Sequence, residues 1–124
     1  MFKKCIFILA TTCMMYSCTT QTETNPFLSE FQTEHGVPPF DKIKLEHYEP
    51  AFLKGIEEQN ANIDAIVNNS EAPTFENVIV ALDNSAPILD RVSAIFYNMT
   101  DAEKTPGLNE LSIKIAPTLS EHSD

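Results

Sequence analysis

The residues of this chain that could do chemistry are three histidines and a surplus of carboxylates. A zinc site on one helix requires two histidines four residues apart, because both rings must reach the metal from the same face. His35, His47 and His122 do not have that spacing. The sequence therefore predicts no metal ligands, and we expect this chain to bind no cofactor.

Two short segments combine a histidine with other reactive groups. The Glu46–Glu49 segment (EHYE) places two carboxylates near a histidine, but it lies at an expected helix start, where the helix dipole alone favours acidic residues. The His122–Asp124 segment (HSD) contains the three groups of a hydrolytic triad, but adjacent residues point to different sides and cannot form one. With only three glycines, the sequence also has no glycine-rich phosphate loop. We therefore predict no catalytic residues.

Helices are the elements that must position these side chains, because apolar residues recur at steps of three and four. The sequence predicts a helix over residues 51–67, with Pro50 in its first turn. A second runs from Pro73 to Met99, kinked or broken at Pro87. The expected inward-facing residues of these two helices are Phe52, Ile56, Ile63, Ile66, Val67, Phe75, Val78, Ile79, Leu82, Leu89, Val92, Phe96 and Met99. We expect the two helices to form an antiparallel hairpin.

A third helix should follow a turn at Pro106-Gly107, interrupted by Pro117 and with Ile113 away from its apolar face. Its expected inward residues are Leu108, Leu111, Ile115 and Leu119. Before the hairpin, the two prolines of Val37–Leu45 favour an extended lead-in, with Phe40, Ile43 and Leu45 turned inward. The predicted fold is therefore all-α, a helical hairpin plus a third helix over residues 37–124.

Three sequence segments occur in order along this helical region: PPFDKIKLEHYEPAF (Pro38–Phe52), PTFENVIVALDNSAPILDRV (Pro73–Val92) and APTLSEHSD (Ala116–Asp124). They resemble the N-terminal region of the thimet-oligopeptidase-type zinc metallopeptidases, which include peptidyl-dipeptidase Dcp and oligopeptidase A. The resemblance covers about residues 25–124. The chain has no HExxH motif, and in the family the third segment is followed by further sequence. The resemblance therefore implies a fragment or a prematurely ended reading frame.

In the intact family, zinc held by the HExxH helix and a further glutamate activates water, and dipeptides leave the C-terminus of oligopeptides. The resemblance thus implies zinc and an oligopeptide substrate for an intact protein. This chain would supply a non-catalytic helical wall of the substrate channel and would be inactive alone. A second hypothesis is a small acidic helical lipoprotein that binds a peptide or protein partner through an exposed apolar stripe.

The N-terminus has the composition of a lipoprotein leader. Residues 1–17 contain Lys3, Lys4 and an apolar run too short to span a membrane, and Cys18 follows a serine as expected of a lipid-attachment site. The alternative is an ordinary signal peptide cleaved nearby, with Cys18 as a spare thiol. The lipoprotein hypothesis predicts an exported protein anchored in the cell envelope, either facing the periplasm or in the outer membrane.

Residues 18–36 are polar and rich in threonine and glutamate, which favours a flexible tether. In the resembling family the fold already begins at Asn25–Leu28, and Phe27, Leu28 and Phe31 would then pack on the body. The two alternatives place the start of the folded region about ten residues apart.

The chain is strongly acidic, with 8 basic and 18 acidic residues and a net charge of −10. Loss of Lys3 and Lys4 with the leader would make the mature charge −12. A surface this negative repels phosphate backbones, so we expect no nucleic acid partner. It also lacks a basic patch for anionic lipids, so membrane contact is expected through the lipid anchor only.

Overall fold

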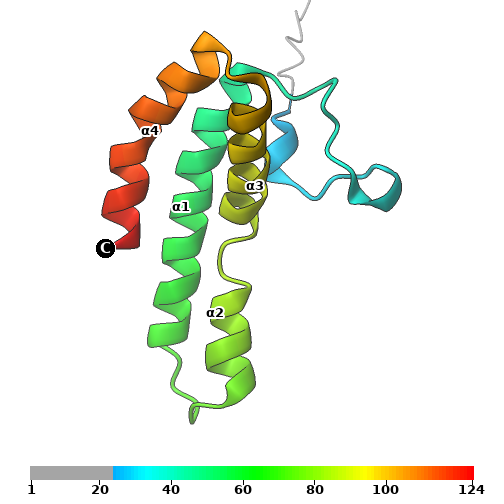
Figure 1. Ribbon diagram of the computed structural model, residues 1–124. Helices are drawn as coiled ribbons and strands as arrows, with labels where there is room; N and C mark the ends of the chain where they lie inside the picture. The colour runs from blue at the N-terminus through cyan, green and yellow to red at the C-terminus, as the bar shows by residue number, and fades with distance from the viewer. Residues whose placement is uncertain (1–23) are drawn as a thin grey trace, which may run out of the picture.

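The computed structural model describes residues 24–124 of this chain, and every regular element in that range is helical (Figure 1). The predicted all-α fold is confirmed. The leader of residues 1–17 and the predicted lipid-attachment residue Cys18 lie outside the described residues. In chain order the elements are the short helices η1 (Pro26–Leu28) and η2 (Glu34–Gly36), then α1 (Leu45–Val67), the π-helix η3 (Phe75–Val80), α2 (Ala81–Asp83), α3 (Pro87–Glu103) and α4 (Pro106–Ser123).

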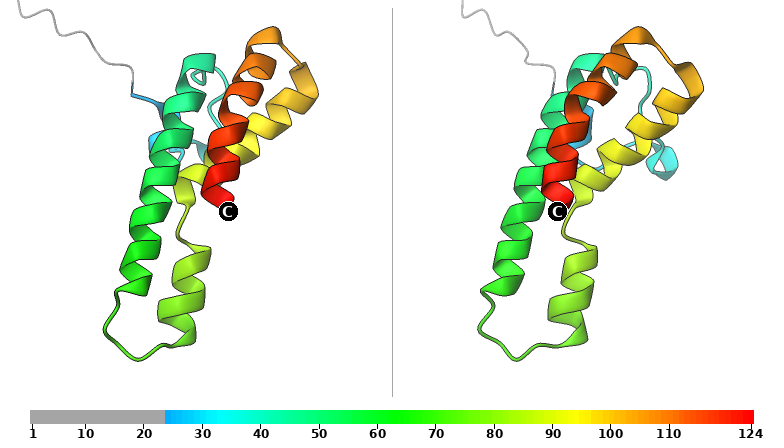
Figure 2. Two further views of the ribbon diagram at one scale, coloured as in Figure 1. Left: turned by 90° about the vertical axis from the view of Figure 1, so that its left-hand side faces the viewer. Right: turned by 60° about the vertical axis from the view of Figure 1, so that its left-hand side comes forward.

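Helices α1, α3 and α4 pack around one hydrophobic core, which we call the body. Its aromatic centre joins two neighbouring elements, since the Phe96 ring of α3 lies 5.2 Å from the Tyr48 ring and 5.3 Å from the Phe52 ring of α1. Val92, Ile95, Leu108, Leu111 and Ile115 complete the buried cluster from α3 and α4. The three helices therefore share a single core (Figure 2).

The segment before α1 contributes to this core. Phe27 of η1 is fully buried, with its ring 5.1 Å from that of Tyr48, and Phe31 packs against the same cluster. The Arg91 guanidinium donates a 2.7 Å hydrogen bond to the Phe27 carbonyl. Leu28 remains exposed. In the described structure the fold thus already begins at η1, as the family resemblance of Asn25–Leu28 implied. Phe27 and Phe31 pack on the body, whereas Leu28 does not.

Helix α1 begins earlier than predicted, at Leu45 rather than after Pro50. The early start is stabilised by a cap, because the Lys44 backbone N–H donates to Nδ1 of His47 at 3.1 Å. Pro50 consequently lies inside the helix, where it removes one backbone hydrogen bond. In the lead-in only Ile43 packs on the core; Phe40 and Leu45 are about half exposed, so their predicted inward orientation was wrong.

The predicted break at Pro87 is confirmed. The helical arm that begins at Phe75 ends at Asp83, and Pro87 occupies the first position of a separate helix, α3, where its missing N–H costs nothing. Two side chains of α1 hold the junction: Asn62 Nδ2 donates to the Ser85 carbonyl at 2.7 Å, and Glu58 Oε2 accepts from the Ile88 backbone N–H at 3.3 Å. The Glu58 carboxylate thus caps α3.

Helix α4 has the predicted inward face, with Leu108, Leu111 and Ile115 buried and Leu119 packed against the core. Ile113 is 69% exposed, as expected. Two predictions about α4 were wrong. The turn before it is made by Lys104, in a left-handed conformation, and Pro106 begins the helix. Pro117 does not interrupt α4, because the carbonyl that it leaves unpaired is that of the solvent-exposed Ile113.

The far part of the hairpin extends beyond the body, and we call it the hairpin lobe (residues 60–84; Figures 1 and 2). It comprises the end of α1, a loop, η3 and α2, and the two helical arms run antiparallel as predicted. No residue of the lobe is buried. Four expected inward residues are instead at least half exposed, namely Val67, Phe75, Ile79 and Leu82.

Candidate functional site

The Glu46–Glu49 segment serves the start of α1. The His47 ring is buried and its Nδ1 accepts the Lys44 N–H, while the His47 carbonyl accepts a 2.7 Å hydrogen bond from the Asn25 amide. Glu49 forms an ion pair with Lys114 of α4 at 2.7 Å. These contacts tie η1, α1 and α4 together. The segment therefore has a structural role in this geometry.

The other two histidines lie far from His47 along the chain and in different surroundings. His35 is exposed, in a left-handed turn, with Nε2 3.5 Å from a Glu34 carboxylate oxygen. His122, in the last turn of α4, has Nε2 2.6 Å from Oε1 of Gln59 in α1. Among residues 24–124 no histidine is hydrogen-bonded to a serine or threonine hydroxyl, the contact that activates a nucleophile.

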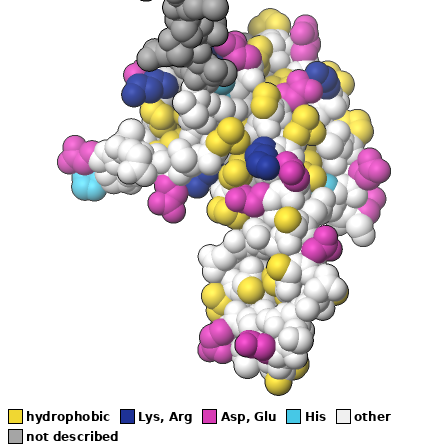
Figure 3. Space-filling view, turned by 180° about the vertical axis from the view of Figure 1, so that it is seen from behind, with side chains coloured by type: hydrophobic (Ala, Val, Ile, Leu, Met, Phe, Trp, Pro, Cys, Tyr) yellow, Lys and Arg dark blue, Asp and Glu magenta, His cyan; other side chains and the backbone are white. Residues whose placement is uncertain are grey.

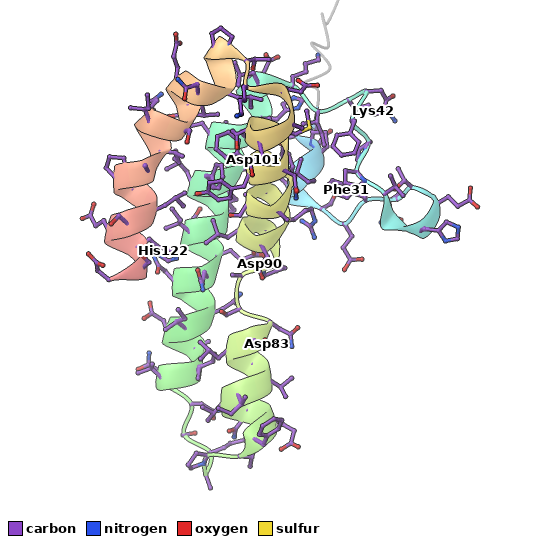
Figure 4. The ribbon with its side chains drawn as sticks, viewed as in Figure 1. Phe31, Lys42, Asp83, Asp90, Asp101 and His122 are labelled. Atoms are coloured by element: carbon purple, nitrogen blue, oxygen red, sulfur yellow. The ribbon has the colours of Figure 1, made fainter. Side chains whose placement is uncertain are left out.

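Several surface hollows lie beside α4, and two of them are larger than 500 Å³. The first, about 730 Å³, lies at the α3–α4 turn and is lined by Tyr97, Thr100, Asp101, Lys104, Pro106, Leu108, Asn109 and Ser112. The second, about 510 Å³, lies where α1, α3 and α4 meet, and its lining includes Gln59, Asp90 and His122. Figure 4 shows Asp90 at the start of α3 and His122 at the end of α4. Each hollow is lined by both polar and apolar side chains.

The pKa values of Tyr48 and Lys54 are shifted by their local surroundings. Burial raises the pKa of the Tyr48 phenol, and the nearby Glu103 carboxylate raises it further. The hydrogen bond and charge of Glu57 raise the pKa of the Lys54 ammonium. Neither group is paired with a second catalytic group, so neither shift identifies an acid or a base for catalysis.

Residues 24–124 contain no group of three histidine, cysteine or acidic side chains close enough to share a metal ion. Within the same residues, no helix combines the length and apolar character needed to cross a membrane.

Sequence reasoning did not identify the hairpin lobe as a distinct surface. A signal was present, because residues 55–86 contain no lysine, arginine or histidine. The helical periodicity of residues 73–82 had suggested a buried stripe instead. Periodicity shows that apolar side chains share a face, but it does not show what covers that face.

Together these contacts define a helical scaffold whose polar side chains fasten its elements to one another. The chain is homologous to two kinds of bacterial peptidase, which confirms its resemblance to the thimet-oligopeptidase-type family. It is 41% identical over 88 residues to dipeptidyl carboxypeptidase of Salmonella typhimurium and 38% identical over 100 residues to that of Escherichia coli. Oligopeptidase A of Escherichia coli is 31% identical over 100 residues.

These matches include 71–81% of this chain but only 13–15% of the relatives' length. No family model matches the sequence. This chain therefore resembles a small part of each of these bacterial peptidases.

Proposed function

We propose that this chain is the N-terminal, non-catalytic helical part of a secreted zinc metallopeptidase that releases dipeptides from the C-terminus of oligopeptides. The observation that carries the proposal is the 41% identity to a dipeptidyl carboxypeptidase over 71% of the chain. In this proposal the helices supply shape to a substrate channel. The zinc ligands and the base belong to another part of the longer protein.

The contacts of the body suit such a role. A channel wall must keep its position while substrates pass, and the body is fixed by a shared aromatic core and by the hydrogen bonds of Asn25, Glu58 and Arg91 between elements. No described group of side chains matches the donor set of a zinc site. We therefore assign no step of the hydrolysis to this chain.

The coding DNA beyond codon 124 tests the proposal. We expect an open frame that contains HExxH followed by a downstream glutamate, and we expect its product to release dipeptides from a C-terminally free oligopeptide. The 124-residue chain alone should show no such activity with or without added zinc. A stop codon with no such frame, or hydrolysis by the 124-residue chain alone, would contradict it.

The lipid anchor is a separate part of the proposal. Acyl chains on Cys18 would hold the protein at the cell envelope, since each buried CH₂ contributes about 0.8 kcal/mol. Metabolic labelling with a radioactive fatty acid should mark the wild-type chain and the Cys13→Ser control, but not Cys18→Ser. Equal labelling of the Cys18→Ser variant would rule out this attachment site.

A further inference from the structure

The hairpin lobe carries an apolar surface that residues 24–124 leave uncovered. Phe75, Ile79 and Leu82 recur at steps of four and three along η3 and α2, and each is at least half exposed. Phe75 is 65% exposed. Val80 and Val67, at the end of α1, add to the uncovered apolar area. Single exposed apolar residues are ordinary, but a row of them on one helical arm indicates an interaction surface.

The arm that presents this row is held in place. At its start Thr74 and Asn77 cap each other, with Asn77 Oδ1 accepting from the Thr74 N–H at 2.7 Å and Thr74 Oγ1 accepting from the Asn77 N–H at 3.1 Å. At its end the Asn62 side chain of α1 holds the Ser85 carbonyl. A surface fixed at both ends loses little conformational freedom when a partner binds.

The charge of the lobe restricts what can cover it. Its only charged residues are Asp64, Glu71, Glu76 and Asp83, and no lysine, arginine or histidine lies between residues 55 and 86. From the side shown in Figure 3, the lobe carries hydrophobic and acidic side chains but no Lys or Arg. A second copy of the lobe would bring four more carboxylates to the interface. Like charges at an interface oppose association, whereas opposite charges guide it.

We propose that the hairpin lobe docks a basic amphipathic segment, in which a row of apolar side chains is bordered by lysine or arginine. The apolar row would lie on Phe75, Ile79 and Leu82, and the basic border would meet Glu76 and Asp83. This inference rests on the lobe itself and stands whether or not the peptidase proposal holds.

The chain contains no tryptophan, which allows a direct test. The probe is a synthetic peptide of about 18 leucine and lysine residues with one tryptophan, long enough to form an amphipathic helix. Titration with the full-length chain should shift the tryptophan emission to shorter wavelength and saturate. The same peptide with glutamate in place of lysine should not bind.

Matched variants locate the site. Because two exposed apolar side chains are removed, Phe75→Ser combined with Ile79→Ser should weaken binding of the lysine peptide about tenfold or more. Ile113→Ser, which removes an exposed apolar side chain of α4, should bind as the wild type does. Circular dichroism on all variants confirms that the helices are retained, as expected for exposed positions.

Other occupants of the lobe would give different results. Sedimentation showing a wild-type dimer that the double variant abolishes would mean that a second copy covers the lobe, and it would overturn the proposal. Stronger peptide binding after Lys3→Glu and Lys4→Glu would assign the surface to the chain's own N-terminal segment. Equal loss of binding in Ile113→Ser and the double variant would also overturn it. A separate basic partner is supported only if the lysine peptide binds and the glutamate peptide does not. In addition, the Phe75→Ser and Ile79→Ser double variant must weaken binding while Ile113→Ser does not.

Discussion

The body and the hairpin lobe share helix α1, yet apolar side chains are buried in the body and exposed in the lobe. In the body, Phe27, Phe52 and Phe96 are fully buried, and three long helices and one short helix surround them. In the lobe only two helical arms meet, and no residue is buried. Two helices can cover one side of each other at most, so the outward apolar side chains of the lobe remain in solvent.

The two regions differ in the number of elements that pack against helix α1. Helix α1 crosses both regions: as far as Gln59 it contacts η1, α3 and α4, whereas its last turns run beside the arm formed by η3 and α2. Along α1 the packing therefore changes from a core enclosed by several helices to contact with a single helical arm. We expect the free energy of unfolding to be concentrated in the body, and local opening to be easiest in the lobe.

The largest expected effect comes from removing the central aromatic ring of the body. Phe96→Ala deletes a fully buried side chain that contacts the Tyr48 and Phe52 rings, and should lower the free energy of unfolding by about 3–5 kcal/mol. Ile79→Ala in the lobe should change it by no more than about 0.5 kcal/mol. Urea denaturation followed by circular dichroism measures both. Equal losses would show that the lobe belongs to the same cooperative core.

A smaller effect should follow from a methyl group at the contact between α1 and α3. A Cβ at position 55 would lie 2.7 Å from the Leu89 backbone nitrogen, so Gly55→Ala must push the two helices apart, at a cost of about 1–3 kcal/mol. Gly107→Ala is the control, because its Cβ would meet only the flexible end of the Leu45 side chain. Thermal unfolding should rank Gly55→Ala as the less stable variant. The reverse order would mean that α1 and α3 can separate freely.

The junction between the two regions can be loosened without touching the core. Asn62→Ala removes the hydrogen bond to the Ser85 carbonyl and should cost about 1 kcal/mol. Because that bond anchors the end of α2, the effect should be local, and amide hydrogen exchange should accelerate in residues 75–84 more than in α3. The exposed Asn60→Ala serves as control. Uniform acceleration across both regions would indicate that the lobe does not open separately.

The smallest effect is confined to alkaline pH. Burial holds the pKa of Tyr48 above its unfolded value of 10.0, so the folded state favours the neutral phenol. The resulting stabilisation is complete below about pH 10 and is lost as the pH rises through the folded pKa. Tyr48→Phe should therefore lose less stability than the wild type as the pH rises above about 10. Tyr97→Phe, at an exposed position, should follow the wild type; identical curves for all three proteins would argue against a buried phenol.

Local sequence signals predicted most of the body. The three helices, the break at Pro87 and the inward face of α4 followed from periodicity and from the cost of a proline inside a helix. The early start of α1 could not be predicted in this way, because it depends on a histidine side chain acting as the cap. Nor could the continuation of α4 past Pro117, which depends on the exposure of Ile113.

The exposed surface of the lobe was harder to predict than the helices. Phe75, Ile79 and Leu82 have the same spacing as core residues, and only the tertiary arrangement shows that no third element among residues 24–124 buries them. The carboxylate of Glu58 is a similar case, since its role at the start of α3 joins residues 30 apart in the sequence. Spacing identifies a face, and the fold decides whether that face is buried.

The hydrogen bonds of Asn25 and Arg91 fix the point at which the folded body begins. If Cys18 carries the proposed lipid, Asn25 lies seven positions after the anchor along the chain. Even a fully extended chain of that length spans only about 25 Å. The body would therefore work within roughly one domain diameter of the bilayer, and its height above the membrane would be set by where η1 is fastened rather than by a long stalk.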